Sequence, residues 1–175
     1  MTGTIQVVGI NKKEKKGSID ALPLNAGKGV YLIQCELSET RRISIGKLGR
    51  FLFQKGVYLY VGSAFGPGGI RARVNHHLKI SDKPHWHMDY LRKFVTIKEL
   101  WLFETESRIE HAWARILLNM RGMETPIPGF GSSDCTCVAH LFYLKAFESH
   151  ARKKTDSLMD ARSVRVLLTG FDSSA

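Results

Sequence analysis

Cysteine, proline and long apolar runs are all scarce in this chain of 175 residues. It contains three cysteines and five prolines. An odd, low number of cysteines argues against a framework of disulfide bonds and favours a reducing compartment. No apolar run approaches the roughly 18 residues that a membrane span needs, and the N-terminal segment lacks the apolar core of a signal peptide. We therefore expect a cytoplasmic protein, nucleoid-associated if its source is prokaryotic, with no membrane partner.

Acidic residues are also few relative to basic ones. The chain has 16 Asp and Glu against 26 Lys and Arg, which gives a formal net charge of +10. Residues 41–93 hold eleven bases and only two acids, so this segment alone carries +9. The bases are Arg41, Arg42, Lys47, Arg50, Lys55, Arg71, Arg73, Lys79, Lys83, Arg92 and Lys93. Such a local excess favours a polyanionic partner, because contact with a phosphate backbone releases condensed counterions.

The hydrophobic share of 43% is large enough for one domain with its own core. We interpret residues 1–28 as a flexible basic leader, because its charged stretch is more typical of a solvated tail than of a binding arm. The domain would then span 29–147. The remaining residues, 148–175, form a C-terminal tail whose one apolar run, 164–168, has no predicted placement.

Hydrophobic periodicity predicts a mixed domain. Alternating or β-branched runs indicate strands at 29–37, 57–62, 95–104 and 140–147, and a hairpin with one basic face at 41–56. Helical spacing of apolar residues indicates helices at 70–79, 85–94 and 107–122. The fold class is therefore α/β or α+β, with a small, mainly antiparallel sheet flanked by helices. We expect the hairpin, at 41–55, to extend this sheet.

Two tyrosine tripeptides lie within this pattern. Gly29-Val30-Tyr31 opens the first strand, and Tyr60-Val61-Gly62 ends a later one. A glycine-rich loop follows at 63–69. Arg73 and His77 come next, four residues apart and so on one face of a helix. Glu110 lies near the start of the longest predicted helix.

This arrangement resembles the GIY-YIG nuclease superfamily. The two tripeptides match its two motifs, and Arg73, His77 and Glu110 match its downstream arginine, histidine and metal-binding glutamate. The resemblance covers about residues 29–120. Runs shared with one uncharacterised branch, YVGSA (60–64), WHMDYL (86–91) and GFGSSDCTCVAHLFY (129–143), extend it to about 143. Some members of that branch are fused to base-excision repair enzymes, which points to DNA.

The resemblance implies a metal-dependent endonuclease that hydrolyses phosphodiester bonds, in DNA rather than RNA and in a repair setting. Tyr31 would act as the general base on water, and a nearby cation such as Arg73 would have to lower its pKa from about 10. Arg73 would also brace the scissile phosphate. Tyr60 and His77 would hydrogen-bond the nucleophile or the phosphate, and Glu110 would hold Mg²⁺ or Mn²⁺.

Candidate contacts to nucleic acid lie around these residues. Basic side chains would contact phosphates, and Phe130 in the GFG turn would stack on a base. The predicted binding residues are Lys47, Arg50, Lys55, Gly62, Ser63, Arg71 and Phe130.

Two other groups of residues are candidate metal sites. His85, His87 and Asp89 would share one face on a strand, but Pro84 favours a helix start, where only His85 and Asp89 align. In the second group, Cys135, Cys137 and His140 offer up to three zinc ligands. A structural zinc site needs a fourth, from Asp134, the distant Cys35 or another histidine. No second close ligand pair exists, so the sequence favours packed thiols over zinc here.

Two alternatives to the nuclease therefore stay open. The first is a binding module of the same fold that does not cleave nucleic acid. The second is a metal hydrolase centred on His85, His87 and Asp89. The oligomeric state is not predicted.

Overall fold

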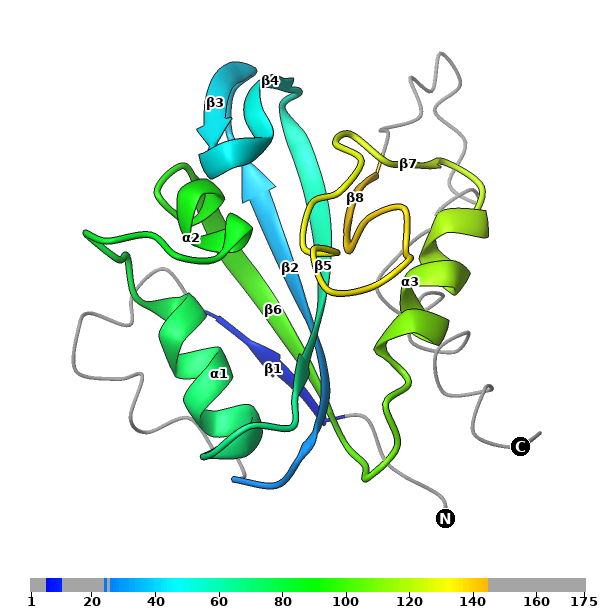
Figure 1. Cartoon of the computed structure of the whole chain (residues 1–175). Coiled ribbons are helices and arrows are strands. Elements are labelled where there is room, and N and C mark those ends of the chain that lie inside the picture. Colours follow the sequence, from blue (N-terminus) through cyan, green and yellow to red (C-terminus); the bar gives the residue numbers. More distant parts are fainter. Residues whose placement is uncertain (1–5, 11–23, 25, 145–175) are drawn as a thin grey trace, which may run out of the picture.

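A six-stranded antiparallel sheet forms the centre of the protein (Figure 1). The computed structural model describes residues 6–10, 24 and 26–144. The strand order is β1-β6-β2-β5-β8-β7, and each neighbouring pair is antiparallel. The strands are β1 (Gln6–Gly9), β2 (Gly29–Leu37), β5 (Gly56–Ala64), β6 (Val95–Glu104), β7 (Met123–Glu124) and β8 (Leu141–Leu144).

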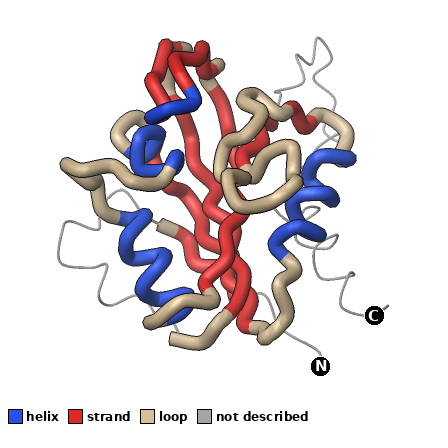
Figure 2. Tube along the Cα trace, viewed as in Figure 1, coloured by secondary structure: helices blue, strands red, loops and turns tan. Residues whose placement is uncertain are grey.

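Helices cover both faces of this sheet, with α1 (Gly69–Leu78) and α2 (His87–Arg92) on one side and α3 (Glu110–Asn119) on the other (Figures 1 and 2). Side chains on β2 alternate between two cores. Tyr31 and Ile33 belong to the core under α1 and α2, whereas Val30 and Leu32 belong to the core under α3. Burial on both faces explains why the central strands are almost continuously apolar. None of the described helices is long and apolar enough to cross a membrane.

The predicted fold class is confirmed: the chain forms a mixed α+β domain with a mainly antiparallel sheet and flanking helices. The strands predicted at 29–37 and 95–104 have the observed bounds. The three predicted helices are present, but α2 and α3 are shorter at both ends than their patterns indicated. The last predicted strand is present as β8, and its residues 145–147 lie outside the described residues.

The basic hairpin does not extend the main sheet, and that part of the prediction was wrong. Its strands, β3 (Arg41–Ile45) and β4 (Gly49–Phe53), form a separate two-stranded sheet joined by a 3₁₀ turn at Gly46–Leu48. β5 pairs with β2 on one side, and on the other side its Val57–Tyr60 segment, nearest the hairpin, pairs with β8, so the hairpin finds no free edge there. The hairpin packs towards α2 instead, with Ile43, Ile45 and Phe53 buried.

The interpretation of residues 1–28 as a loose leader was wrong for part of that segment. Residues 6–9 form β1, which pairs with β6 at one edge of the sheet. Leu24 is buried, and its carbonyl accepts a hydrogen bond from Arg71 Nε at 2.7 Å. An unpaired sheet edge leaves a row of backbone groups without partners, and even a short strand satisfies them. The C-terminal tail, 148–175, lies outside the described residues.

The start of β2 gives a direct test of this packing. A Cβ at Gly29 would collide with the Phe103 carbonyl oxygen and lie 2.9 Å from Ile70 Cδ1. We expect Gly29→Ala to lower the free energy of unfolding by about 1–3 kcal/mol, the usual cost of overpacking, as measured by urea denaturation. Gly66→Ala is the matched control, because nothing lies within 4 Å of its Cβ position. Equal stability of the two variants would contradict the packing described here.

Candidate functional site

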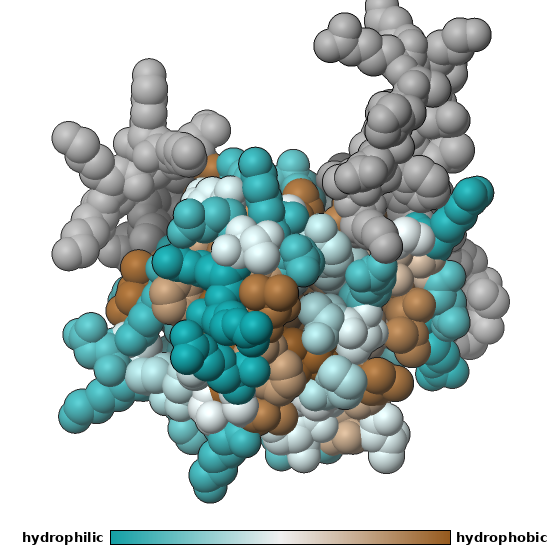
Figure 3. Space-filling model, turned by 90° about the horizontal axis from the view of Figure 1, so that it is seen from above, coloured by the Kyte–Doolittle hydropathy of each residue, from teal (hydrophilic) through white to brown (hydrophobic). Residues whose placement is uncertain are grey.

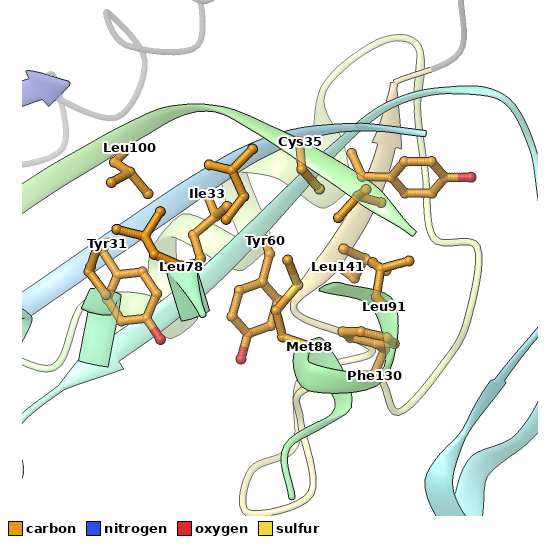
Figure 4. Packing of buried hydrophobic residues seen from close by; sticks show 14 of the residues in the cluster. Tyr31, Ile33, Cys35, Tyr60, Leu78, Met88, Leu91, Leu100, Phe130 and Leu141 are labelled. Carbon is orange, nitrogen blue, oxygen red and sulfur yellow. The ribbon is translucent and has the colours of Figure 1, made fainter. Parts of the chain in front are cut away.

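Tyr31, Tyr60 and His77 meet on the face of the sheet that α1 covers. Tyr31 comes from β2, Tyr60 from β5 and His77 from the last turn of α1. The Tyr31 hydroxyl lies 2.8 Å from His77 Nε2, and the Tyr60 and His77 rings are edge to face with centroids 5.7 Å apart. Figure 4 shows the two tyrosines side by side, with both hydroxyl groups directed away from the sheet. The structure thus gathers three of the five predicted catalytic residues in direct contact.

Gly62 makes room for the Tyr31 ring. The two residues are direct partners across the β2–β5 ladder. A Cβ at Gly62 would collide with the Tyr31 phenol. The glycine of the second tripeptide is therefore required by the tyrosine of the first, which is a packing reason for its place in the sequence.

Burial governs the acidity of both phenols. It raises the pKa of Tyr31 well above its ordinary value of 10, and the neighbouring Tyr60 raises it further. Burial likewise raises the pKa of Tyr60 to about 12. The Arg73 charge lowers the pKa of each phenol, as expected for Tyr31, but the cost of burying a phenolate is larger. The expectation that Arg73 lowers the pKa of Tyr31 below 10 was therefore wrong, and both groups are neutral phenols at pH 7.

His77 is neutral as well. Burial lowers its pKa to about 3, although the carboxylate of Asp89 acts in the opposite direction. A neutral imidazole has one lone pair, so we infer that Nε2 accepts the hydrogen bond from the Tyr31 hydroxyl and that Nδ1 carries the hydrogen. Nδ1 is buried without a hydrogen-bond partner, and Asp89 Oδ1 lies 4.0 Å away. The Tyr31 phenol, the His77 imidazole and the Asp89 carboxylate are therefore neighbours in that order.

The Asp89 carboxylate is fixed by hydrogen bonds at the start of α2. Its Oδ2 accepts hydrogen bonds from the backbone N–H groups of His85 and Trp86 at 2.9 and 3.0 Å, and His76 Nε2 lies 2.9 Å from Oδ1. Burial alone would raise the pKa of Asp89, but these hydrogen bonds bring it below its ordinary value. The carboxylate is therefore charged at neutral pH.

The structure does not assemble His85, His87 and Asp89 into a metal centre. Both oxygens of Asp89 are engaged as just described, and His87 Nδ1 accepts a hydrogen bond from the Gly131 N–H at 2.9 Å. These three residues are not among those that gather as metal ligands in the described part of the chain. Asp89 instead binds His76 of α1 and places its charge beside His77, a role that its spacing in the sequence did not indicate.

Arg73 is anchored above Trp86. Its guanidinium lies 4.1 Å from the centre of a Trp86 ring, a cation–π contact worth about 0.5–2 kcal/mol. The same charge acts on both tyrosines and on His77. Arg73 therefore belongs to the tyrosine site electrostatically while its head group stays half-exposed. Arg92, by contrast, donates to the carbonyls of His77, Leu78 and Val95 and closes the end of α1.

Glu110 lies elsewhere, at the start of α3 on the opposite side of the sheet. It is only 4% exposed, and its Oε2 has no hydrogen-bond partner. Its Oε1 lies 3.8 Å from His111 Nε2 and 3.9 Å from Arg108 Nη1. No hydrogen bond or ion pair found among the described residues joins Glu110 to either tyrosine. The predicted site is thus split into a tyrosine group and a separate buried carboxylate.

Beside Glu110, four side chains gather as a candidate metal site. The ligand atoms of His111, Cys135, Cys137 and His140 all lie within 4.8 Å of one another. Three of these were predicted as a candidate site, and His111 from α3 supplies the missing fourth donor. Nothing in the sequence around His111 indicates this role, because it lies 24 residues before Cys135 and only the docking of α3 brings it close.

The candidate nucleic-acid contacts divide into exposed and buried groups. Lys47, Arg50 and Lys55 are exposed on or beside the hairpin, and Arg71 is exposed on α1 although its Nε is bound to Leu24. Ser63 is half-buried and Gly62 is buried. Phe130 is fully buried against Tyr60 and His87, so the prediction that it stacks on a base was wrong.

The hairpin end of the molecule is basic and hollowed. A cavity of about 310 Å³ lies between the hairpin and the segment around α2, with Arg42, Arg50 and Lys93 in its wall beside Tyr90 and Phe94. Figure 3 views the molecule from this end and shows hydrophilic side chains gathered there, with apolar patches between them. The wall of this cavity thus combines positive charge with aromatic surface.

Comparison with known proteins places the chain in one family. Residues 30–163 match the family described as a domain of unknown function, DUF123. No curated protein and no solved structure gives a match.

The buried imidazole predicts an effect of pH on stability. The pKa of His77 is about 3 in the folded chain against an ordinary value of 6.5, so as pH falls below 6.5 the unfolded chain takes up this proton first. The free energy of unfolding should then fall with decreasing pH, by up to about 1.4 kcal/mol per pH unit for this proton. We expect His77→Gln to show a shallower decline between pH 6 and pH 4, about a one-proton difference in slope. A wild-type slope in His77→Gln would contradict the buried neutral imidazole.

Proposed function

Because this chain belongs to the DUF123 family, whose description names no activity, we propose a function from its own site: a metal-dependent nuclease of the GIY-YIG type that hydrolyses phosphodiester bonds, with DNA as the favoured substrate. The observation that carries the proposal is the 2.8 Å hydrogen bond between the Tyr31 hydroxyl and His77 Nε2, with Tyr60 and Arg73 beside it. A tyrosine paired with a neutral imidazole can pass on a proton without being ionised beforehand.

The proton route follows from the neutral state of both groups. Tyr31 gives its proton to His77 Nε2 as it takes one from the attacking water, so no free phenolate accumulates. The imidazolium formed on His77 faces Asp89, whose negative charge offsets part of the cost of burying it. Asp89 thus acts on the imidazole by charge alone, because His77 Nδ1 has no hydrogen bond to it. Arg73, held above Trp86, would brace the negative charge on the phosphoryl oxygens.

Glu110 fits the role of a metal ligand. Its Oε2 is a buried carboxylate oxygen without a partner, which is costly unless a cation or water satisfies it. Mg²⁺ or Mn²⁺ bound there would stabilise charge on the phosphoryl and leaving oxygens. β5 pairs with β8 from Val57 to Tyr60, so the β5 residues that follow extend past β8. A nucleic-acid strand crossing this part of β5 would be near groups from both faces of the sheet.

The second candidate is a nucleic-acid-binding module without cleavage. One observation favours it specifically: Glu110 is surrounded by Arg108, His111 and the cysteine–histidine group, whereas Tyr31 interacts with Tyr60, Arg73 and Asp89. If Glu110 and the tyrosine group do not act on the same phosphate, the basic surface can still bind nucleic acid but the chain does not cleave it. The binding and the cleavage must therefore be measured separately.

Cleavage is tested on a labelled duplex and its RNA counterpart, with Mg²⁺ or Mn²⁺ present. We expect the wild-type protein to cut DNA in preference to RNA. Tyr31→Phe keeps the ring but removes the proton relay, and Glu110→Gln removes the anionic ligand. Tyr31→Phe should lower the cleavage rate about 10²–10⁴-fold, the usual contribution of a general acid–base group. Glu110→Gln should also lower the cleavage rate, because the metal ion loses its anionic ligand. DNA binding by both variants should stay within a few-fold of wild type.

Tyr143→Phe is the matched control, since its hydroxyl donates to the Lys55 carbonyl at 3.1 Å, away from His77. It should cleave at the wild-type rate. DNA bound but never cut by the wild-type protein would select the binding module. Cleavage that survives in Tyr31→Phe would remove the proton relay from the mechanism.

Binding is tested by its dependence on salt. Each phosphate contact contributes a slope of about −0.9 in log K against log salt concentration. Lys47→Ala and Arg50→Ala together should reduce this slope by about 2 and weaken binding to all sequences alike. Lys98→Ala is the control, because its Nζ lies 2.7 Å from Glu36 and is already neutralised within the protein. A slope that changes equally in both variants would place the contact surface elsewhere.

A further inference from the structure

We propose that His111, Cys135, Cys137 and His140 bind one Zn²⁺ in a closed four-coordinate site, which fixes the irregular segment 125–140 to α3 and to β5. This inference is independent of the proposed nuclease activity, because it concerns how the wall of the tyrosine site is held. It rests on four donor atoms that converge on one point from a helix and a loop.

The donor atoms have the spacing of a tetrahedral site. Zinc binds thiolate sulfur at about 2.3 Å and imidazole nitrogen at about 2.0–2.1 Å, so tetrahedral neighbours lie about 3.3–3.8 Å apart. Cys135 Sγ lies 3.4 Å from His140 Nε2, and Cys137 Sγ lies 3.3 Å from His111 Nδ1. The largest separation in the group is below 4.8 Å. An inward movement of a few tenths of an ångström would bring all four donors to bonding distance.

The two histidines present the correct ring atoms. His140 Nδ1 lies 3.2 Å from the Val61 carbonyl oxygen, which accepts its hydrogen and leaves the Nε2 lone pair directed at the cysteines. His111 directs Nδ1 at Cys137 and Nε2 at the Glu110 carboxylate, 3.8 Å away. A carbonyl or carboxylate behind each imidazole is the usual support of a metal-bound histidine. Glu110 would therefore also stabilise this site.

The ligand chemistry selects the metal. Two thiolates and two imidazoles in a tetrahedral set suit Zn²⁺, whereas Mg²⁺ prefers oxygen ligands in an octahedral set. A two-iron cluster distributes its ligands over two metal atoms, but these donors lie around a single point. All four positions are supplied by the protein, so the ion would have a structural role and no open position for a substrate.

The place of the site in the fold explains what the ion would do. The segment between β7 and β8 has no regular secondary structure from Thr125 to His140, and it lies against β5 (Figure 1). It nevertheless holds Phe130 against the Tyr60 ring and Gly131 against both Tyr60 and His140. Zinc would tie this segment to α3 through His111 and so keep one wall of the tyrosine site in position.

The test measures metal in the full-length protein, purified without added metal or an affinity tag that binds it. Elemental analysis should find about one zinc per chain. Cys135→Ser and His111→Asn should each lower this ratio at least about fivefold, because loss of one ligand in a closed site weakens zinc strongly. Cys35→Ala is the matched control: it removes the third thiol, which is buried on β2 outside the group, and should keep the full ratio.

Two further measurements do not depend on whether a variant folds. Removal of metal from the wild-type protein by a chelator should lower its melting temperature, and zinc should restore it while Mg²⁺ should not. Cobalt added to the metal-free protein should give the absorption of tetrahedral cobalt with thiolate charge-transfer bands. A zinc ratio near zero in the wild-type protein, together with no cobalt spectrum, would overturn the proposal. So would cobalt bands of octahedral oxygen coordination.

The nuclease proposal stands or fails separately from this one. Tyr31→Phe should bind zinc at the wild-type ratio while losing cleavage. A protein that contains zinc and never cuts nucleic acid would support the zinc site and contradict the nuclease. Cleavage by a protein that contains no zinc would support the nuclease and contradict the zinc site.

Discussion

The cost of burying a phenolate is the constraint on which the tyrosine site depends. Tyr31 is almost fully enclosed between β2 and α1, so its hydroxyl must stay protonated and must have an acceptor. His77 provides that acceptor only while it is neutral, and its own burial keeps it so. Asp89 remains charged beside the imidazole, and its charge opposes part of the effect of burial on the pKa of His77. Each group has the protonation state that its neighbour requires.

Much of the fold follows from periodicity in the sequence. The bounds of β2 and β6 were predictable because both strands are long and carry alternating or continuous apolar residues. The two hairpin strands were also predictable, but their separation from the main sheet was not. Whether a hairpin joins a sheet depends on which strand edges remain free after the sheet has formed. β1 is four residues long and carries too weak a pattern to identify it. Its position depends on the open edge of β6, which only the folded chain reveals.

The candidate site was predictable where chemistry is local. Arg73 and His77 share one face of α1. The two tripeptides, which contain Tyr31 and Tyr60, lie on paired strands. The contact between these two pairs of residues therefore follows largely from local structure. Glu110 and His111 lie on α3, whose docking is a long-range property. The sequence therefore named Glu110 without placing it and missed His111 altogether. Phe130 was misjudged because its glycine-rich surroundings are typical of exposed turns, whereas the segment folds back onto β5.

The space that Gly62 leaves for the Tyr31 ring links the two tripeptides over evolutionary time. A side chain at position 62 becomes sterically acceptable only when the aromatic ring at position 31 has been replaced by something smaller. Descendants that lose the tyrosine are then free to lose the glycine, while descendants that retain the tyrosine are not. Paired loss at these two positions would accordingly mark lineages that keep the scaffold without the phenol at position 31.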